Sequence, residues 1–204
     1  MLPTRCIILG FFALLCCGFV ALDVKWPPQE TQRLISLRIL AAGMPNGMAE
    51  RIQDAAAMWT SPAVRFVLAI DQASYTGEPG AGTIALGNAE PHGRAGTQHY
   101  ATQRGLSHCS IVIDLDVGPW HTGAESPPPT HFDTQTIVAH ELGHCLGLGH
   151  SDQGAPPVVM RTFIHTGEWQ RVLGSDDIAG RDALFPLRPP LPVVRRSGCA
   201  LFGG

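Results

Sequence analysis

Apolar residues in the central part of the chain recur with two different spacings, which predict the strands and helices of an α+β domain. Short runs that are apolar throughout, or that alternate with polar residues, favour β-strands. We expect five strands, over residues 32–40, 64–70, 82–87, 95–101 and 109–117. Apolar positions one helical turn apart predict a helix over 48–59, which Pro62 ends.

Two more helices are predicted in the second half of the chain. Asp133 suits the N-cap of a helix over 134–146, and Gly147 is where that helix should stop, because glycine accepts the left-handed conformation. A loop containing Met160 follows, and then a last helix over 175–185. The order of strands and helices predicts one domain of ordinary size.

The two ends of the chain differ in composition from this domain. Arg5 is followed by an apolar run without charge up to Asp23, which is typical of a secretory signal peptide over 1–21. We therefore expect a secreted protein, extracellular or periplasmic; the alternative is a segment that stays as a membrane anchor. A Pro-rich tail is predicted over 187–204, so the domain spans 24–186.

Charge excludes some classes of partner. The chain has 204 residues, 15% of them charged, and a formal net charge of −3. Without a basic excess we expect no nucleic-acid binding, and no membrane binding unless the N-terminal segment stays as an anchor. We expect a monomer.

Export changes the interpretation of the cysteines. Removal of the signal peptide leaves Cys109, Cys145 and Cys199. In an oxidising compartment, an odd number implies one pair with a leftover thiol, or a bridge between chains. Cys145 either packs as a small apolar residue or pairs with Cys109.

The segment "VAHELGHCLGLGHS" (138–151) carries the candidate chemistry. On a helix, His140 and His144 lie one turn apart on the same face, where two imidazoles bind one metal ion. Glu141 lies beside them, and a turn after the helix allows His150 to supply a third nitrogen. Three histidines leave a fourth position open, as in catalytic zinc sites. The alternatives are ordinary solvated or core histidines, and a zinc site without turnover.

This motif resembles the zinc-binding consensus of the metzincin metallopeptidases, and it is most similar to that of the matrixins, the matrix-metalloproteinase-like group. "PPVVM" places Met160 where metzincins have a methionine-containing turn. "LGSDDIAGRDALF" resembles the C-terminal helix of the matrixins, with Asp176 and Asp177 as its paired aspartates. "IQDAAAMWT" resembles their first helix, and the resemblance covers most of 31–186.

The resemblance implies a twisted five-stranded mixed sheet, two long helices, and a small C-terminal subdomain with the methionine turn and a final helix. It implies a zinc-dependent endopeptidase, in which Glu141 is the general base and then the general acid. The metal ligands it implies are His140, His144 and His150, and the structural residues are Met160, Asp176 and Asp177. Protein or peptide substrates would lie extended along an edge strand around 93–101.

Some residues have less specific interpretations. "RTFIHTGEW", after Met160, departs from the usual Pro-Tyr pairing of the family, so the preferred substrate side chain is not predicted. Asp114 and Asp116 are candidate Ca²⁺ ligands or the solvated face of a strand. Four further histidines are available for the second, structural zinc site that the family has, but their surroundings differ from the family pattern, and we expect them on the surface: His92, His99, His108 and His121.

Two classes of function follow from the sequence. The first is an active zinc endopeptidase, and the second is a zinc-containing binding or adhesion module without catalysis. Glu141 favours the enzyme, because a fold that needs only the metal does not require a base at that position.

Overall fold

Five stretches of the chain are described in the computed structural model. They are residues 20–29, 31–76, 79–88, 95–151 and 157–187. The expected signal peptide over 1–21 and the expected tail over 187–204 therefore lie almost wholly outside the described residues. Within the described ranges, no helix is long and apolar enough to cross a membrane.

A five-stranded sheet with strand order β2-β1-β3-β5-β4 forms one layer of the protein. Its strands are β1 (Arg33–Leu40), β2 (Val64–Asp71), β3 (Thr83–Asn88), β4 (Ala95–Thr102) and β5 (Gly105–Ile113). Neighbouring strands are parallel except β4 and β5, which are antiparallel. The expected five-stranded mixed sheet is confirmed, with β2 and β4 at its two edges. A separate short pair joins β6 (Trp120–His121) to β7 (Phe132–Asp133).

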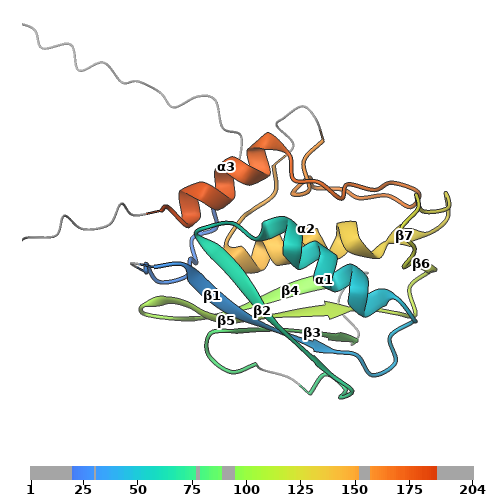
Figure 1. Ribbon diagram of the computed structural model, residues 1–204, viewed down its shortest axis with the longest axis horizontal. Helices are drawn as coiled ribbons and strands as arrows, with labels where there is room; N and C mark the ends of the chain where they lie inside the picture. The colour runs from blue at the N-terminus through green and yellow to red at the C-terminus, as the bar shows by residue number, and fades with distance from the viewer. Residues whose placement is uncertain (1–19, 30, 77–78, 89–94, 152–156, 188–204) are drawn as a thin grey trace, which may run out of the picture.

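Two helices cover the same face of the sheet (Figure 1). They are α1 (Met48–Trp59) and α2 (Thr134–Leu146), and both have the predicted bounds. The residues of α1 that recur at helical spacing are buried, as expected: Met48, Ile52, Ala55, Ala56 and Trp59. The indole Nε1 of Trp59 donates to the carbonyl of Ala139 at 2.7 Å, which ties α1 to the middle of α2. The last helix, α3 (Ser175–Leu184), ends one residue before its predicted end.

Both ends of α2 are built from the residues that the sequence indicated. The carboxylate of Asp133 accepts a hydrogen bond from the backbone N–H of Thr136 at 3.0 Å, which satisfies a free donor of the first turn. Gly147 has a φ of 107°, and Leu148 then donates to the carbonyl of Gly143 at 3.0 Å. A side chain at Gly147 would be strained in this left-handed conformation, so glycine both ends the helix and turns the chain.

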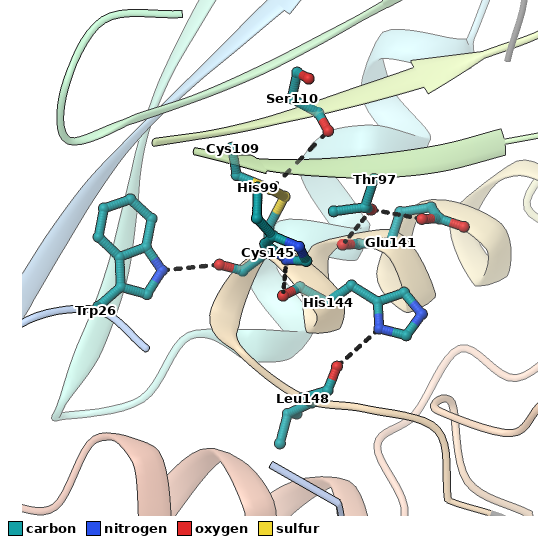
Figure 2. The surroundings of a disulfide bond; sticks show 9 residues. All are labelled: Trp26, Thr97, His99, Cys109, Ser110, Glu141, His144, Cys145 and Leu148. Carbon is teal, nitrogen blue, oxygen red and sulfur yellow. Dashed lines mark hydrogen bonds between the residues drawn. A yellow bond between two sulfur atoms is a disulfide. The ribbon is translucent and has the colours of Figure 1, made fainter. Parts of the chain in front are cut away.

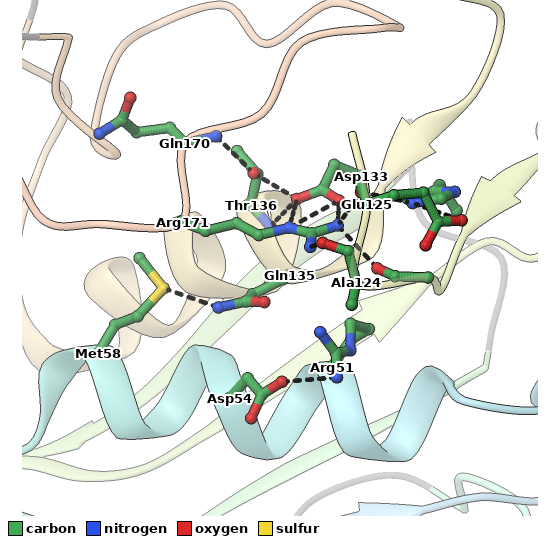
Figure 3. A network of polar contacts seen from close by, with 12 residues as sticks. Arg51, Asp54, Met58, Ala124, Glu125, Asp133, Gln135, Thr136, Gln170 and Arg171 are labelled. Carbon is green, nitrogen blue, oxygen red and sulfur yellow. Dashed lines mark hydrogen bonds and ion pairs between the residues drawn. The ribbon is translucent and has the colours of Figure 1, made fainter. Parts of the chain in front are cut away.

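A buried ion pair anchors the start of α2 (Figure 3). The Asp133 carboxylate, which is inaccessible to solvent, lies 2.5 Å from Nη2 of Arg171. The same guanidinium donates to the carbonyls of Ala124 and Gly123, at 2.7 and 3.0 Å. Arg171 therefore joins the loop before α2 to the segment after Met160, and the loss of either charged partner would leave the other buried without compensation.

The N-terminal part of the described chain lies against the other end of α2. Gly149 donates its N–H to the carbonyl of Val20 at 2.7 Å. The indole of Trp26 donates to the carbonyl of Cys145 at 2.8 Å. Val20 lies within the predicted signal peptide, so cleavage after residue 21 would remove the first of these bonds and keep the second.

The predicted strand over 109–117 is wrong in its bounds, because β5 begins and ends earlier. At its start, Leu106 already pairs with the N-terminal segment, a contact between residues far apart in the sequence. At its end, Asp114 accepts a hydrogen bond from the N–H of Asp116 at 2.9 Å, which turns the chain out of the strand. The two aspartates are therefore turn residues and not the alternating face of a strand, and a calcium site there stays a prediction.

A disulfide joins Cys109 in β5 to Cys145 in α2 (Figure 2). Both cysteines are buried. Of the two interpretations of Cys145, the structure decides for pairing with Cys109, while Cys199 lies outside the described residues. Because Cys145 directly follows His144, the covalent bond fixes the last turn of α2 to β5, the strand next to the edge strand β4.

We predict that replacement of both cysteines, Cys109→Ala with Cys145→Ala, lowers the free energy of unfolding by about 4 kcal/mol. The bond closes a loop with a sequence separation of 36 residues, and its loss frees the unfolded chain. Urea unfolding of parent and double variant, both with zinc added, measures the difference. An unchanged midpoint and slope would show that the bond contributes no stability.

Candidate metal centre

The end of α2 and the turn after it bring three histidines together. His140 and His144 lie one turn apart, and the chain reverses at Gly147 so that His150 faces both of them. The three Nε2 atoms are 3.0, 3.2 and 3.2 Å apart. Within the described residues, no other group of three or more histidine, cysteine, aspartate or glutamate side chains is close enough to share a metal ion. A zinc ion about 2.0–2.1 Å from each nitrogen fits a triangle of this size.

Hydrogen bonds to the opposite ring nitrogens define the tautomer of two of these imidazoles. Nδ1 of His140 lies 2.9 Å from the carbonyl oxygen of Val159, and Nδ1 of His144 lies 2.7 Å from that of Leu148. A carbonyl oxygen only accepts, so each Nδ1 carries the proton and each Nε2 carries a lone pair. Lone pairs that converge on one point repel each other, and a cation at that point removes the repulsion.

Burial keeps both of these imidazoles neutral. It lowers the pKa of His140 from 6.5 to about 4. It also lowers the pKa of His144 to about 4, and the nearby His140 contributes to that shift. His150, by contrast, is exposed. At neutral pH the Nε2 atoms of His140 and His144 are therefore free of protons that would compete with a metal ion.

Glu141 lies beside the three histidines, and a residue of the sheet holds its carboxylate. The hydroxyl of Thr97 in β4 donates to Oε2 of Glu141 at 2.5 Å (Figure 2). Glu141 is buried, so this bond is protected from water. The sequence did not identify Thr97, because the pattern of β4 does not indicate which helix its side chains meet.

A turn that contains Met160 packs under α2. Its sulfur and the ring of Trp59 lie so close to Gly143 that a Cβ atom at that position would overlap them. Gly143 is therefore required for the close approach of these two side chains to the helix. Met160 is buried beneath the turn of helix that carries the first two histidines.

The paired aspartates lie at the start of α3 and bind the turn beneath the histidines. Asp177 accepts from the backbone N–H of Val159 at 2.8 Å and from the next N–H at 3.1 Å. Burial raises the pKa of Asp177, although these backbone donors act in the opposite direction. Val159 therefore links Asp177 to His140. Its N–H binds the Asp177 carboxylate, and its carbonyl binds Nδ1 of His140. Asp176 accepts from the hydroxyl of Ser151, which follows the third histidine.

Comparison with known proteins agrees with this geometry. The family model described as matrixin matches residues 42–186. The chain belongs to the matrixin family. Matrix metalloproteinase-25 of Homo sapiens is 29% identical over 170 residues, which are 80% of this chain and 27% of that protein. Interstitial collagenase of Sus scrofa is 40% identical over 67 residues, which are 30% of this chain and 13% of that protein.

The alignment with this matrixin thus covers only 27% of the length of the human relative. Among solved structures, High choriolytic enzyme 1, a hatching enzyme zinc-protease from Oryzias latipes, aligns with 81% of this chain and 95% of its own at 16% identity. The TM-score of that alignment is 0.44.

The segment after Met160, residues 161–169, is closed by an ion pair and is followed by two residues that bind the start of α2. Arg161 and Glu168 form an ion pair across it, with 2.9 Å between Nη2 and Oε2. The N–H of Gln170 donates to the hydroxyl of Thr136 at 2.8 Å, and Arg171 follows directly with its bonds to the start of the helix (Figure 3). The segment is therefore anchored to the first turn of α2.

The expectation that four further histidines lie on the surface is wrong for two of the three that are described. His108 and His121 are buried. His99 is partly buried, and its Nε2 donates to the carbonyl of His144 at 2.8 Å (Figure 2). Alternation along a strand shows which residues share a face, but only the packing of the sheet shows which face is covered. His92 lies outside the described residues.

We predict that the metal-free protein loses stability as the pH falls from about 6.5 to about 4. In this window the unfolded chain binds protons that the buried His140 and the partly buried His144, with pKa values of about 4, do not accept in the folded protein. Urea unfolding of the chelator-treated protein should show a loss on the order of 5 kcal/mol between pH 7 and pH 4.5, about half of it from each histidine.

Carboxyl groups also titrate in this pH range. Variants are therefore needed to identify the contribution of His140 to the pH dependence of stability. His140→Gln should reduce the dependence on pH, whereas the exposed control His165→Gln should keep the parental dependence. Equal dependence in all three proteins would contradict the assignment.

Proposed function

We propose that this matrixin is an exported zinc-dependent endopeptidase with its catalytic domain over residues 24–186. The observation that carries the proposal is the convergence of three imidazole Nε2 atoms beside a buried carboxylate. His140, His144 and His150 would hold the zinc ion through these nitrogens. Three protein ligands leave a position for the reacting groups, which is the arrangement of a catalytic site.

The chain supplies the proton transfers. A zinc ion held by the three histidines would act as a Lewis acid toward the scissile carbonyl and the attacking water. Glu141 would take a proton from that water and then give it to the leaving amine. Thr97 binds one carboxylate oxygen of Glu141 and would orient the group for both transfers. Met160, Asp176 and Asp177 would have structural roles beneath the ligands.

Substrate would bind in extended form along β4. This strand is an edge of the sheet, and among the described residues β5 is its one strand neighbour, so the other side of its backbone could pair with a peptide. Thr97 and His99 lie two residues apart on one face of β4, and both contact α2, at Glu141 and at the carbonyl of His144. A peptide paired with β4 would therefore lie next to the helix that carries the base. The part of the expected binding segment before Ala95 lies outside the described residues.

Export is supported by two independent features. The N-terminal 21 residues have the composition of a secretory signal peptide. The disulfide between Cys109 and Cys145 is typical of proteins that fold in an oxidising compartment. Secretion to the periplasm or outside the cell accounts for both features.

A binding or adhesion module that holds zinc without turnover is the second candidate. The same histidines would serve it, but the Thr97–Glu141 hydrogen bond favours the peptidase. An oriented, buried carboxylate beside the metal ligands is required for proton transfer, and metal retention alone does not require it.

We predict that Glu141→Gln lowers kcat by about 10²- to 10⁴-fold and changes KM little, because glutamine keeps the shape but cannot accept a proton. The exported parent and variant should be compared on one peptide that the parent cleaves from a broad library. Zinc content should be equal in both proteins. Parental kcat in a zinc-loaded variant would exclude Glu141 as the base, and a parent that cleaves no peptide in the library would favour the binding module.

We predict that Thr97→Val lowers kcat roughly tenfold, with KM and zinc content close to those of the parent. Valine has the shape of threonine but no hydroxyl, so the Glu141 carboxylate loses a hydrogen bond that is typically worth about 1.5–3 kcal/mol. Thr97→Ser keeps the hydroxyl and should keep most of the parental kcat. A valine variant as fast as the parent, or a serine variant as slow as the valine variant, would contradict this role.

A further inference from the structure

The outer edge of β2 is unusually apolar for an exposed strand. In the described part of the chain, β2 has one strand neighbour, β1, so its other side is open. Val67, Leu68 and Ile70 are 52%, 41% and 46% exposed, and Leu34 in the adjacent β1 is 56% exposed. Alternate residues of a strand point to opposite faces, so Leu68 and Ile70 lie on one face of this edge and Val67 lies on the other, with Leu34 beside it. Exposed apolar residues on both faces of an edge strand are available to a strand that pairs with it.

This edge lacks most of the features that usually prevent pairing with another strand, and its only charged residues, Arg65 and Asp71, stand at the two ends of residues 65–71. Residues 65–71 contain no proline, glycine or lysine, and β1 and β2 are paired in register without a bulge. Exposed edges that stay monomeric are generally interrupted by such residues or by a twist of the strand. The unprotected edge of β2 therefore fits a partner that adds a strand.

We propose that two copies of this chain associate through β2, as antiparallel strands related by a two-fold axis at Leu68. In this register Arg65 of each copy lies opposite Asp71 of the other, and Leu68 lies opposite its own equivalent. Phe66 then meets Ile70 of the second copy. Opposite residues in an antiparallel pair share a face of the sheet, so apolar residues meet apolar residues and each arginine meets an aspartate.

Charge complementarity identifies a second copy as the occupant. Arg65 is exposed, and the Asp71 side chain is 40% exposed at the other end of the same strand. Asp71 forms an ion pair through Oδ2 with Arg38 of its own copy, at 2.7 Å, so Arg65 of the second copy would be a further cation beside this carboxylate. A shift of two residues in either direction would place Asp71 opposite Ala63 or Val67, and it would leave both charges without a partner across the interface. One strand thus carries both halves of a self-complementary interface, as two-fold symmetry requires.

This dimer would leave the metal centre accessible. β2 and β4 are opposite edges of the sheet, so the candidate substrate edge would remain open in both copies (Figure 1). The inference does not rest on the proposed peptidase activity, and it replaces the expectation of a monomer.

Sedimentation velocity of the exported chain over a range of micromolar concentrations tests the dimer. The parent should associate reversibly. Arg65→Asp places two carboxylates opposite each other, and Asp71→Arg places two guanidinium groups opposite each other. Each variant alone should raise the dissociation constant of the dimer about tenfold, because two symmetry-related ion pairs become repulsive.

An equimolar mixture of the two variants gives the sharpest test. Each introduced charge then faces an opposite charge on the other variant, so the mixture should form a heterodimer with near-parental affinity. Arg104→Asp, the same change at an exposed position outside β2, should dimerise like the parent. A parent that is monomeric at all concentrations would overturn the proposal, as would association that these β2 variants do not weaken or that mixing does not restore.

Discussion

The convergence of three imidazole lone pairs is the constraint on which the rest of this structure depends. His140 and His144 present neutral Nε2 atoms to each other because carbonyl groups hold the protons of their Nδ1 atoms. Such an arrangement is electrostatically unfavourable without a cation, so the surrounding structure must hold the rings in place until a metal binds. Contacts between α2 and the residues packed around it restrain the rings.

Each part of α2 is fixed by a different interaction. At its start, Asp133 is paired with Arg171. In its middle, Ala139 accepts from the indole of Trp59. At its end, Cys145 is bonded covalently to the sheet. Backbone hydrogen bonds alone would allow the ends of an isolated helix to fray, whereas these tertiary contacts hold the histidine face against one fixed point.

The two edges of the sheet have different chemistry. β4 directs Thr97 and His99 toward α2 and carries the contact to the Glu141 carboxylate. β2, on the opposite side, presents apolar side chains between one arginine and one aspartate. Because three strands separate these edges, the proposed peptide binding at one and the proposed association at the other would not compete.

The sequence by itself determined the parts of this protein that depend on local patterns. Helical spacing gave the bounds of α1, and Asp133 and Gly147 marked both ends of α2, because caps and periodicity act within a few residues. The spacing of the histidines likewise brought the three rings together, since one turn of helix and one glycine turn are local features. The tertiary structure alone decided the partner of Cys145, the contact of Thr97 with Glu141, and the early start of β5. These depend on which face of a strand is covered and on which distant segment covers it, and no local pattern encodes that information.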